Sequence, residues 1–275
     1  MNEITFKTTP ENAIKKYELS RHKNRPKVRD LIPLIFEGFM EMHGDRCYGD
    51  DKAVVTGLAS FNGESVTVIG VVKGRNTKEN IASNFGLPHP EGYRKALRAM
   101  KQAEKFGRPI ITFVDTPGAF HGVAAEERGQ SEALAHNLME MMGLGVPIVS
   151  VLTGEGGSGG ALALACANRV LILENATYSV ITPKGFASIL WKDPARENEA
   201  VARQRMVSED LLALGVVDRV IPEPPEGAHK DHALCAAAIK AALEVALGEL
   251  RGMDTQALRQ ERYDKFRKMG FFLEN

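Results

Sequence analysis

Two similar apolar segments, each preceded by a predicted helix and followed by a glycine turn, constrain the fold of this chain more than any other feature. The segments are Pro109–Asp115 (PIITFVD) and Pro147–Thr153 (PIVSVLT), and they lie 38 residues apart. Short β-rich runs that alternate with helices favour a sheet covered by helices. We therefore predict an α/β fold built from repeated strand and helix units.

The flanking segments extend this pattern. The β-rich runs Ala53–Phe61 and Val66–Val72 are joined by Asn62-Gly63, a dipeptide that tolerates positive φ, so we expect an antiparallel hairpin. In Glu91–Phe106 apolar residues recur every three or four positions, which predicts a helix with one buried face. Further helices are expected at about 125–142, 159–167, 199–214 and 232–250, and further strands at 170–173 and 178–181.

The composition excludes several classes of protein. Of the 275 residues 44% are apolar, and 35 Lys and Arg balance 35 Asp and Glu, so no nucleic-acid or acidic-membrane partner is predicted. The longest uninterrupted apolar run, Ala161–Ala167, is far shorter than the roughly 18 residues of a membrane span. The start, MNEITFKTTP, does not resemble a secretory signal, so a cytoplasmic protein is expected. Cys47, Cys166 and Cys235 are odd in number and widely spaced, which predicts neither a disulfide framework nor a zinc site.

The one marked charge asymmetry lies near the N-terminus. Between Lys15 and Arg29 seven Lys or Arg stand against one acid, Glu18. We expect residues 1–30 to form a solvated basic helix or arm, with a phosphate or partner contact as the alternative, and residues 31–275 to form a single domain.

The densest signal is the tract Gly154–Gly160 (GEGGSGG), which lies between a predicted strand and a predicted helix. Five of its seven residues are glycine. Glycine inside a regular element costs roughly 0.5 to 1 kcal/mol relative to alanine, so this many glycines indicate that the backbone itself needs them. Three kinds of functional site are compatible with the sequence of this tract.

Two of these three kinds of site are those of dinucleotide-binding enzymes and of hydrolases. Gly154, Gly156 and Gly159 spell the GxGxxG of a dinucleotide site, with Glu174 as the ribose-binding acid, although the segment Gly160–Arg169 is short for the crossover helix. The tract also satisfies the GxSxG of a hydrolase, with Ser158 as the nucleophile. The triad partners would then be His229, Asp231 or His232. A further motif, Asp115–Gly118 (DTPG), resembles a GTPase switch but lacks the upstream phosphate loop that such a switch needs.

The third kind is an oxyanion site. Glycines at a helix start leave main-chain N–H groups free, let a ligand approach them closely, and lie where the helix dipole favours negative charge. The tract is not accompanied by a cluster of side chains typical of a catalytic base and nucleophile. This pattern fits a reaction in which the substrate supplies its own base.

Longer motifs carry a family resemblance that covers roughly residues 30–270. Together they closely resemble the alpha subunits of bacterial acetyl-coenzyme A carboxylase carboxyltransferase. The motifs are Gly74–Glu79 (GRNTKE), Asn84–Gly86 (NFG), Pro90–Leu97 (PEGYRKAL), Asp115–Ala119 (DTPGA), Ala125–Glu132 (AEERGQSE), the glycine tract, and Ala187–Asp193 (ASILWKD).

The resemblance implies a fold and a reaction. The fold is a crotonase-like (ClpP/crotonase) superhelix of repeated ββα units with helical terminal segments. The reaction is transfer of a carboxyl group from carboxybiotin to acetyl-coenzyme A, which gives malonyl-coenzyme A for fatty acid synthesis.

The resemblance also implies residue roles and partners. In the family the second Gly-Gly of the tract offers main-chain N–H groups to the ureido oxygen of biotin, and this role carries onto Gly159 and Gly160. Further candidate substrate-binding residues are Gly156, Gly157, Ser158, Gly118, Ala119, Phe85 and Gly86. The chain is expected to carry no metal and no covalent cofactor, because biotin comes on the biotin carboxyl carrier protein and zinc is expected only in the beta subunit. The beta subunit is the expected obligate partner, and biotin carboxylase belongs to the wider complex.

Besides Thr182, which replaces a similar Ser, three residues depart from the usual family pattern. His121 stands where the family usually has Pro, and the segment Thr182–Phe186 (TPKGF) replaces a usual Ser-Pro-Glu-Gly-Cys. Lys184 thereby reverses a charge, and Phe186 replaces a cysteine. His121 could be a ligand, a base or a loop variant, and the glycine tract itself is intact.

Overall fold

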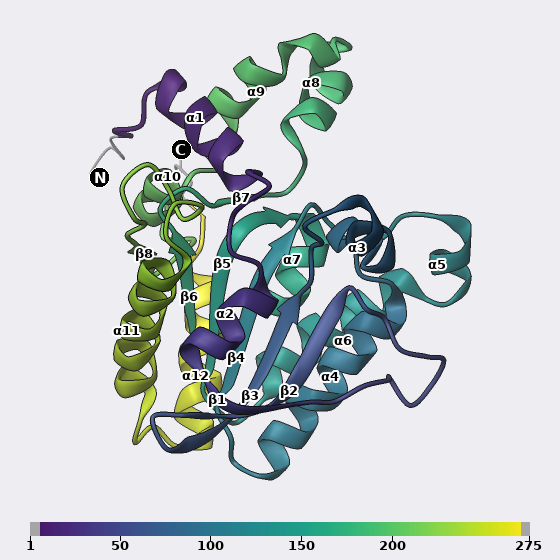
Figure 1. The fold of residues 1–275 in the computed structure, drawn as a ribbon, viewed down its shortest axis with the longest axis vertical. Coiled ribbons are helices and arrows are strands. Elements are labelled where there is room, and N and C mark those ends of the chain that lie inside the picture. The colour runs from purple at the N-terminus through teal and green to yellow at the C-terminus, as the bar shows by residue number, and fades with distance from the viewer. Residues whose placement is uncertain (1–5, 271–275) are drawn as a thin grey trace, which may run out of the picture.

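The computed structural model describes residues 6–270, and eight strands of this part of the chain form one mixed sheet (Figure 1). The strands are β1 (Glu37–Glu41), β2 (Val54–Phe61), β3 (Glu64–Val71), β4 (Ile110–Thr116), β5 (Ile148–Gly157), β6 (Arg169–Leu173), β7 (Thr177–Ser179) and β8 (Arg219–Ile221). Their order across the sheet is β1-β2-β3-β4-β5-β6-β8, and β7 pairs with the end of β5. The first three strands are antiparallel, and the pairs from β3 to β8 are parallel.

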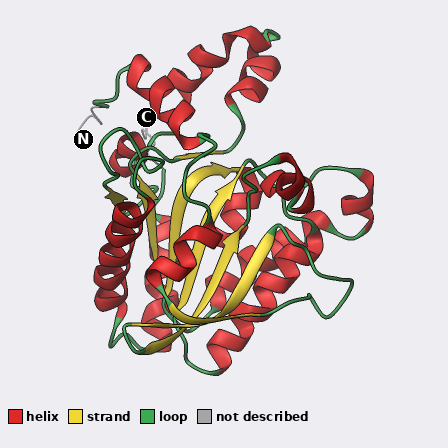
Figure 2. Cartoon of the chain, viewed as in Figure 1, coloured by secondary structure: helices red, strands yellow, loops and turns green. Residues whose placement is uncertain are grey.

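The helices surround the sheet, as Figure 2 shows. They are α1 (Pro10–Ser20), α2 (Val28–Ile35), α3 (Thr77–Ala82), α4 (Pro90–Lys105), α5 (Val123–Glu127), α6 (Gln130–Gly143), α7 (Ser158–Ala165), α8 (Pro183–Trp191), α9 (Glu197–Gln204), α10 (Ser208–Ala213), α11 (His232–Leu250) and α12 (Thr255–Arg267), with short 3₁₀ turns at Asn84–Gly86 and Pro194–Arg196. Helices α4 and α7 pack on the sheet with α6 outside them, and α2 and α11 pack together. Among the described residues no helix has the length and hydropathy that crossing a lipid bilayer requires.

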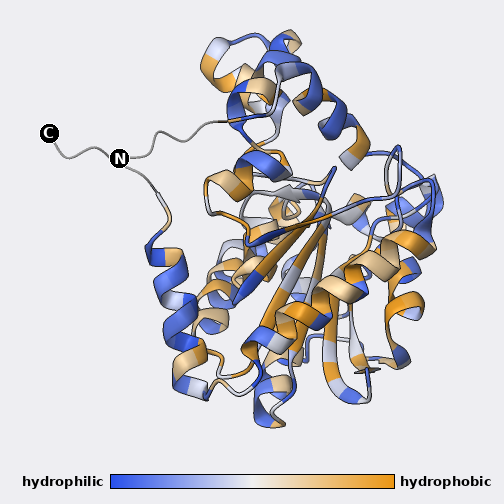
Figure 3. Cartoon of the chain, turned by 90° about the vertical axis from the view of Figure 1, so that its left-hand side faces the viewer, coloured by the Kyte–Doolittle hydropathy of each residue, from blue (hydrophilic) through white to orange (hydrophobic). Residues whose placement is uncertain are grey.

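The repeated apolar segments are the central strands, as predicted. All seven residues of β4 are buried, because a parallel strand inside an α/β fold is covered on both faces. Figure 3 shows the same central strands as mostly hydrophobic. The predicted hairpin is confirmed as β2 and β3, and its turn residues Asn62 and Gly63 have φ values of 51° and 82°.

Two predicted helices are each broken in two. The helix expected at 125–142 is α5 followed by α6, because Gly129 takes a left-handed conformation with a φ of 80° between them. The helix expected at 199–214 is α9 followed by α10, with Arg205 at a φ of 52° after the first. Positive φ interrupts the helical repeat, and the apolar periodicity alone does not reveal it.

Helices α1, α8 and α9 form a small lobe beyond the carboxyl ends of the parallel strands (Figure 1). Its own apolar cluster contains Ala13, Tyr17, Val201, Met206 and Val207.

The basic N-terminal segment is less solvated than expected. Lys16, Arg25 and Lys27 are buried, so the expectation of a solvated arm is wrong for these three residues. Arg25 pairs with Glu223 at 2.6 Å, with both side chains almost fully buried, and its guanidinium donates to the carbonyl of Thr153. These three cations contact carboxylates or carbonyls near the carboxyl ends of the strands. The expected boundary at residue 30 falls within α2.

Candidate oxyanion site

Three backbone segments named by the sequence come together at the ends of β4 and β5. The α-carbon of Gly157 lies against the carbonyl of Pro117, and that of Gly160 lies against the main-chain nitrogen of Ala119. The hydroxyl of Thr116 is 2.6 Å from the carbonyl oxygens of both Gly86 and Gly118. The structure therefore places the glycine tract, the Gly118-Ala119 loop and the Phe85-Gly86 turn in one region. The binding roles of these residues stay predictions.

The glycine tract makes an abrupt turn from strand to helix. Strand β5 continues to Gly157 and α7 begins at Ser158, one residue earlier than predicted. Ser158 has a φ of 53°, an uncommon conformation for a residue with a side chain. Because a helix provides no carbonyl partner for the N–H groups of its first turn, the amides of Gly159 and Gly160 are free of intrahelical bonds.

Gly159 and Gly160, the predicted donor pair, differ in how accessible they are to a ligand. Gly159 lines a groove of about 250 Å³ beside Ser158, with Leu162, Tyr178, Val180 and Val216 among its other walls. Gly160 is buried, and its carbonyl accepts a hydrogen bond from the Tyr93 hydroxyl at 3.2 Å. A ligand can therefore reach the main chain of the tract at Gly159, whereas Gly160 lies against the Gly118-Ala119 loop.

A cluster of charges that was not predicted from the sequence supports the tract. The ammonium of Lys73 is 2.7 Å from Asp115 and 2.6 Å from Glu155, the one acidic residue of the tract. The amide of Glu155 also donates to Asp115 at 3.0 Å, and Arg21 approaches Glu155 at 3.2 Å. The sequence does place one acid, Asp115, at the end of a predicted buried strand and a second acid among the glycines. Two acids at such positions indicate that a cation lies nearby in the fold.

The charges of the cluster hold one another ionised. Burial alone would raise the pKa of Asp115, but the neighbouring Lys73 and Lys27 outweigh it and lower that pKa to about 2. Burial would likewise lower the pKa of Lys73, yet Asp115 and Glu155 raise it. Asp115 is therefore an ionised carboxylate whose partners, Lys73 and the amide of Glu155, belong to this chain.

The Phe85-Gly86 turn has an unusual backbone. Asn84, Phe85 and Gly86 have successive φ values of 48°, 56° and 75°. Left-handed conformations cost energy at the first two, because they carry side chains, and such strain persists only where the surroundings impose it. Here a Cβ at Gly86 would overlap the side chain of Lys73, so Lys73 contacts the turn as well as the tract.

The two alternative classes of site do not fit this geometry. A dinucleotide site lies where the strand order of an open sheet reverses, but these strands follow the order of the chain without reversal. The Glu174 carboxylate accepts a hydrogen bond from the amide of Glu223, and within residues 6–270 no hydrogen bond joins it to the tract. For a hydrolase, His232 is bonded to the carbonyl of Asn24, and the ring of His229 lies against that of His22, with the ring centroids 4.0 Å apart. Within residues 6–270 no hydrogen bond joins the Ser158 hydroxyl to a histidine.

The three departures from the family pattern lie in exposed segments. His121 is exposed in the loop before α5, next to the ring of Phe120. Lys184 is exposed on α8, and Phe186 packs edge-to-face on Trp191 at 5.3 Å. Neither residue of α8 lines the groove beside Gly159.

The mixed sheet in chain order, with main-chain donors where a strand turns into a helix, defines a crotonase-like α/β protein. Solved structures agree with this fold. Transcarboxylase 12S matches with a TM-score of 0.69 at 21% identity, covering 90% of this chain and 45% of that chain. A Pseudomonas malonate decarboxylase hetero-tetramer in complex with coenzyme A matches with a TM-score of 0.65 at 20% identity, covering 78% and 86%. This chain thus spans about half of the transcarboxylase chain.

Sequence comparison gives the family. The model of the family described as acetyl co-enzyme A carboxylase carboxyltransferase-like matches residues 5–270, and the chain belongs to this family. An acetyl-coenzyme A carboxylase carboxyl transferase subunit alpha of Clostridium perfringens is 55% identical over 258 residues, which cover 94% of this chain and 95% of the relative. The subunit alpha of a Geobacillus species is 54% identical over 271 residues, which cover 98% and 82%. The predicted family and fold are confirmed.

Proposed function

We propose that this chain is the alpha subunit of a heteromeric acetyl-coenzyme A carboxylase carboxyltransferase in the cytoplasm. With its beta subunit it transfers a carboxyl group from carboxybiotin to acetyl-coenzyme A, which yields malonyl-coenzyme A for fatty acid synthesis. Family membership over nearly the whole chain and relatives of more than half identical sequence support the assignment.

The observation that carries the proposal is the open position of Gly159. Its amide lies in the first turn of α7, where the helix dipole favours negative charge, and it borders a groove with mostly apolar walls. Biotin fits such a place, because its sulfur-containing ring is apolar and the oxygen of its ureido ring accepts hydrogen bonds. Carboxybiotin supplies the carboxyl group, and the ureido oxygen gains negative charge as that group leaves.

In this proposal the main chain of the tract stabilises the developing charge. The amide of Gly159 donates from the groove, and the amide of Gly160, in the same helical turn but behind the Gly118-Ala119 loop, contributes through the positive end of the helix dipole. Donors fixed before the reaction need no reorganisation when charge appears, which makes them effective. The Lys73–Glu155 ion pair keeps the tract in place.

The proposed role of this chain determines what its partners must supply. We propose that biotin arrives on the biotin carboxyl carrier protein, that biotin carboxylase acts in the same complex, and that the beta subunit binds acetyl-coenzyme A and carries the zinc. This chain then needs no metal or covalent cofactor of its own.

The test is reconstitution with the beta subunit. The two chains are co-expressed, and decarboxylation of malonyl-coenzyme A is measured with free biotin as the acceptor. We expect activity from the assembled pair and none from either chain alone. An assembled pair without any activity would contradict the proposal.

A further inference from the structure

The groove beside Gly159 has apolar walls that the described residues leave open. Its apolar lining residues are Leu162, Tyr178, Val180 and Val216. Within residues 6–270 Val180 is the most exposed large apolar side chain, at 80%. It continues the wall of the groove and so does not stand alone on a polar surface. Apolar surface of this kind marks a place where another group binds.

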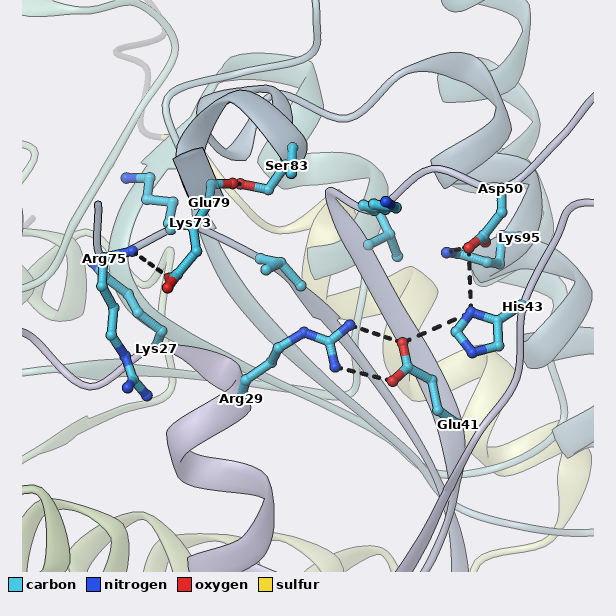
Figure 4. A pocket seen from close by; sticks show the side chains of 15 residues that line it. Lys27, Arg29, Glu41, His43, Asp50, Lys73, Arg75, Glu79, Ser83 and Lys95 are labelled. Atoms are coloured by element: carbon cyan, nitrogen blue, oxygen red, sulfur yellow. Dashed lines mark hydrogen bonds and ion pairs between the residues drawn. The ribbon is translucent and has the colours of Figure 1, made fainter. Parts of the chain in front are cut away.

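A larger cavity, of about 470 Å³, has walls of a different kind (Figure 4). It lies at the start of α2 and the end of β3, and charged side chains dominate its lining. Figure 4 shows Arg29 bonded through both terminal nitrogens to Glu41. The ammonium of Lys95 is 2.6 Å from Asp50. An apolar group would therefore bind beside Gly159 rather than in this cavity.

The chain itself carries an apolar segment close to its C-terminal helix. Residues 271–273 (Phe-Phe-Leu), called here the FFL segment, follow Gly270 and lie outside the described residues. Large apolar side chains gain free energy when they leave water. Gly270 has a φ of 105°, which glycine adopts readily, so the chain turns directly before the FFL segment.

Helix α12 brings this part of the chain near the groove. The ammonium of Lys265 is 3.3 Å from the carbonyl oxygen of Asn168 and pairs with Asp218. Asp218 is only two residues after Val216, which lines the groove. The five residues after Gly270 span at most about 18 Å when fully extended. The FFL segment is therefore within reach of the groove.

A second cavity with apolar walls lies too far away. It has a volume of about 380 Å³ and is lined by residues of α2 and β1, among them Ile32, Phe36 and Phe39. Strand β1 is at the opposite edge of the sheet from β8, the strand that follows Asp218. Six strand spacings of about 4.8 Å separate the two edges by roughly 29 Å. This distance exceeds the reach of five residues.

We propose that the FFL segment docks in the groove beside Gly159 of the same chain and covers it until biotin displaces the segment. The phenylalanine rings lie against the apolar walls, and Val180 becomes buried beneath them. A site that is open in only a fraction of the molecules binds its ligand more weakly by that fraction. The docking stands without the proposed carboxyl transfer, whereas the competition with biotin rests on it.

Thiol labelling of the full chain tests the docking. Val180→Cys places a thiol on the groove wall, exposed Cys47 serves as the internal standard, and Cys166 and Cys235 are buried. Iodoacetamide treatment followed by peptide mass spectrometry gives the rate at each thiol. Adding Phe271→Ser and Phe272→Ser should speed labelling at position 180 at least about fivefold and leave Cys47 unchanged.

A matched variant and a dilution series complete the labelling experiment. Glu274→Gln, which keeps the FFL segment, should label at position 180 as the parent does. Equal rates with and without the two phenylalanines would overturn the proposal. Protection that weakens on dilution would also overturn it, because the covering segment would then belong to a second copy of the chain.

A second measurement uses the native groove. In the assembled pair with the beta subunit, Phe271→Ser with Phe272→Ser should lower the KM for free biotin at least about threefold and leave kcat unchanged. Glu274→Gln should change neither, and an unchanged KM in the double variant would overturn the competition with biotin. An inactive pair with the native segment would contradict the proposed function, and the labelling rates would still decide the docking.

Discussion

The α-carbon of Gly160 lies so close to the main-chain nitrogen of Ala119 that a methyl group on Gly160 would overlap that nitrogen. At Gly159 a methyl group would meet only Leu134, at 4.0 Å, which is an ordinary contact. Glycine is therefore required at these two adjacent positions for different reasons. Gly160 is needed for packing against the loop after β4, and Gly159 is needed only if a ligand approaches.

Gly159→Val is the variant that tests the oxyanion role. The fold has room for the side chain, but the valine would fill the groove where the biotin ring is proposed to bind. We expect a folded variant that assembles with the beta subunit and loses roughly 100-fold or more in decarboxylation rate, comparable to the loss of one oxyanion donor. Full activity of the folded, assembled variant would remove Gly159 from the site.

Gly160→Ala is the matched comparison for packing. Overlap with the backbone of Ala119 should lower the free energy of unfolding by roughly 1 to 3 kcal/mol, as overpacking does elsewhere. Chemical denaturation measures it. An unchanged free energy of unfolding would mean that the Gly118-Ala119 loop moves freely, and the distinction between the two glycines would then fail.

Ser158→Ala separates carboxyl transfer from hydrolase chemistry. The donors of the proposed site are main-chain amides, so the variant should keep its decarboxylation rate within a few-fold of the wild type. Incubation of the wild type with a fluorophosphonate, followed by mass spectrometry, should leave Ser158 unmodified. A total loss of activity together with covalent labelling of Ser158 would instead indicate a nucleophile.

The fold was largely predictable because its signals are local. The repeated apolar segments and the Asn62-Gly63 turn each specify an element through propensity and periodicity, and both predictions are confirmed. Breaks such as those at Gly129 and Arg205 were missed, since a single left-handed residue leaves the apolar pattern on either side unchanged. The expectation of a solvated N-terminal segment was wrong for its buried cations, because a run of Lys and Arg does not reveal which of them pair with carboxylates in the folded chain.

The candidate site was predictable to a smaller extent. The glycine tract is recognisable because its composition has no packing explanation. The cluster formed by Lys73, Asp115 and Glu155 was not, because its members come from three different strand ends and meet only in the fold. For the same reason the different access of Gly159 and Gly160 could not be predicted, since the loop that covers Gly160 lies about forty residues earlier in the chain.

Asp115 should make stability depend on pH in the acid range. Its folded pKa of about 2 lies below the ordinary value of 3.8, so its contribution is fully present above about pH 5 and is lost as the pH falls through 4 towards 2. A shift of this size corresponds to about 2 kcal/mol. Urea denaturation at several pH values should therefore show a smaller loss of stability between pH 4 and pH 2 for Asp115→Asn than for the wild type. Parallel profiles would show that Asp115 keeps an ordinary pKa in the folded chain.

The buried pair of Arg25 and Glu223 predicts strong coupling between two residues 198 positions apart. The Glu223 carboxylate also accepts bonds from Asn175 and Ala228, and although burial would raise its pKa, Arg25 lowers it. Removing one partner leaves the other charge buried and unpaired, so Arg25→Met and Glu223→Gln should each lower the free energy of unfolding by about 3 to 5 kcal/mol.

A double-mutant cycle measures this coupling directly. Because the second substitution removes the charge that the first one left unpaired, the double variant should be more stable than the sum of the single effects by at least about 1 kcal/mol. The comparison uses urea denaturation near pH 7, where both groups are charged. Additive single effects would mean that the two charges do not interact, and the basic N-terminal segment would then hold the start of the glycine tract only through the bonds of Arg25 to the Thr153 carbonyl.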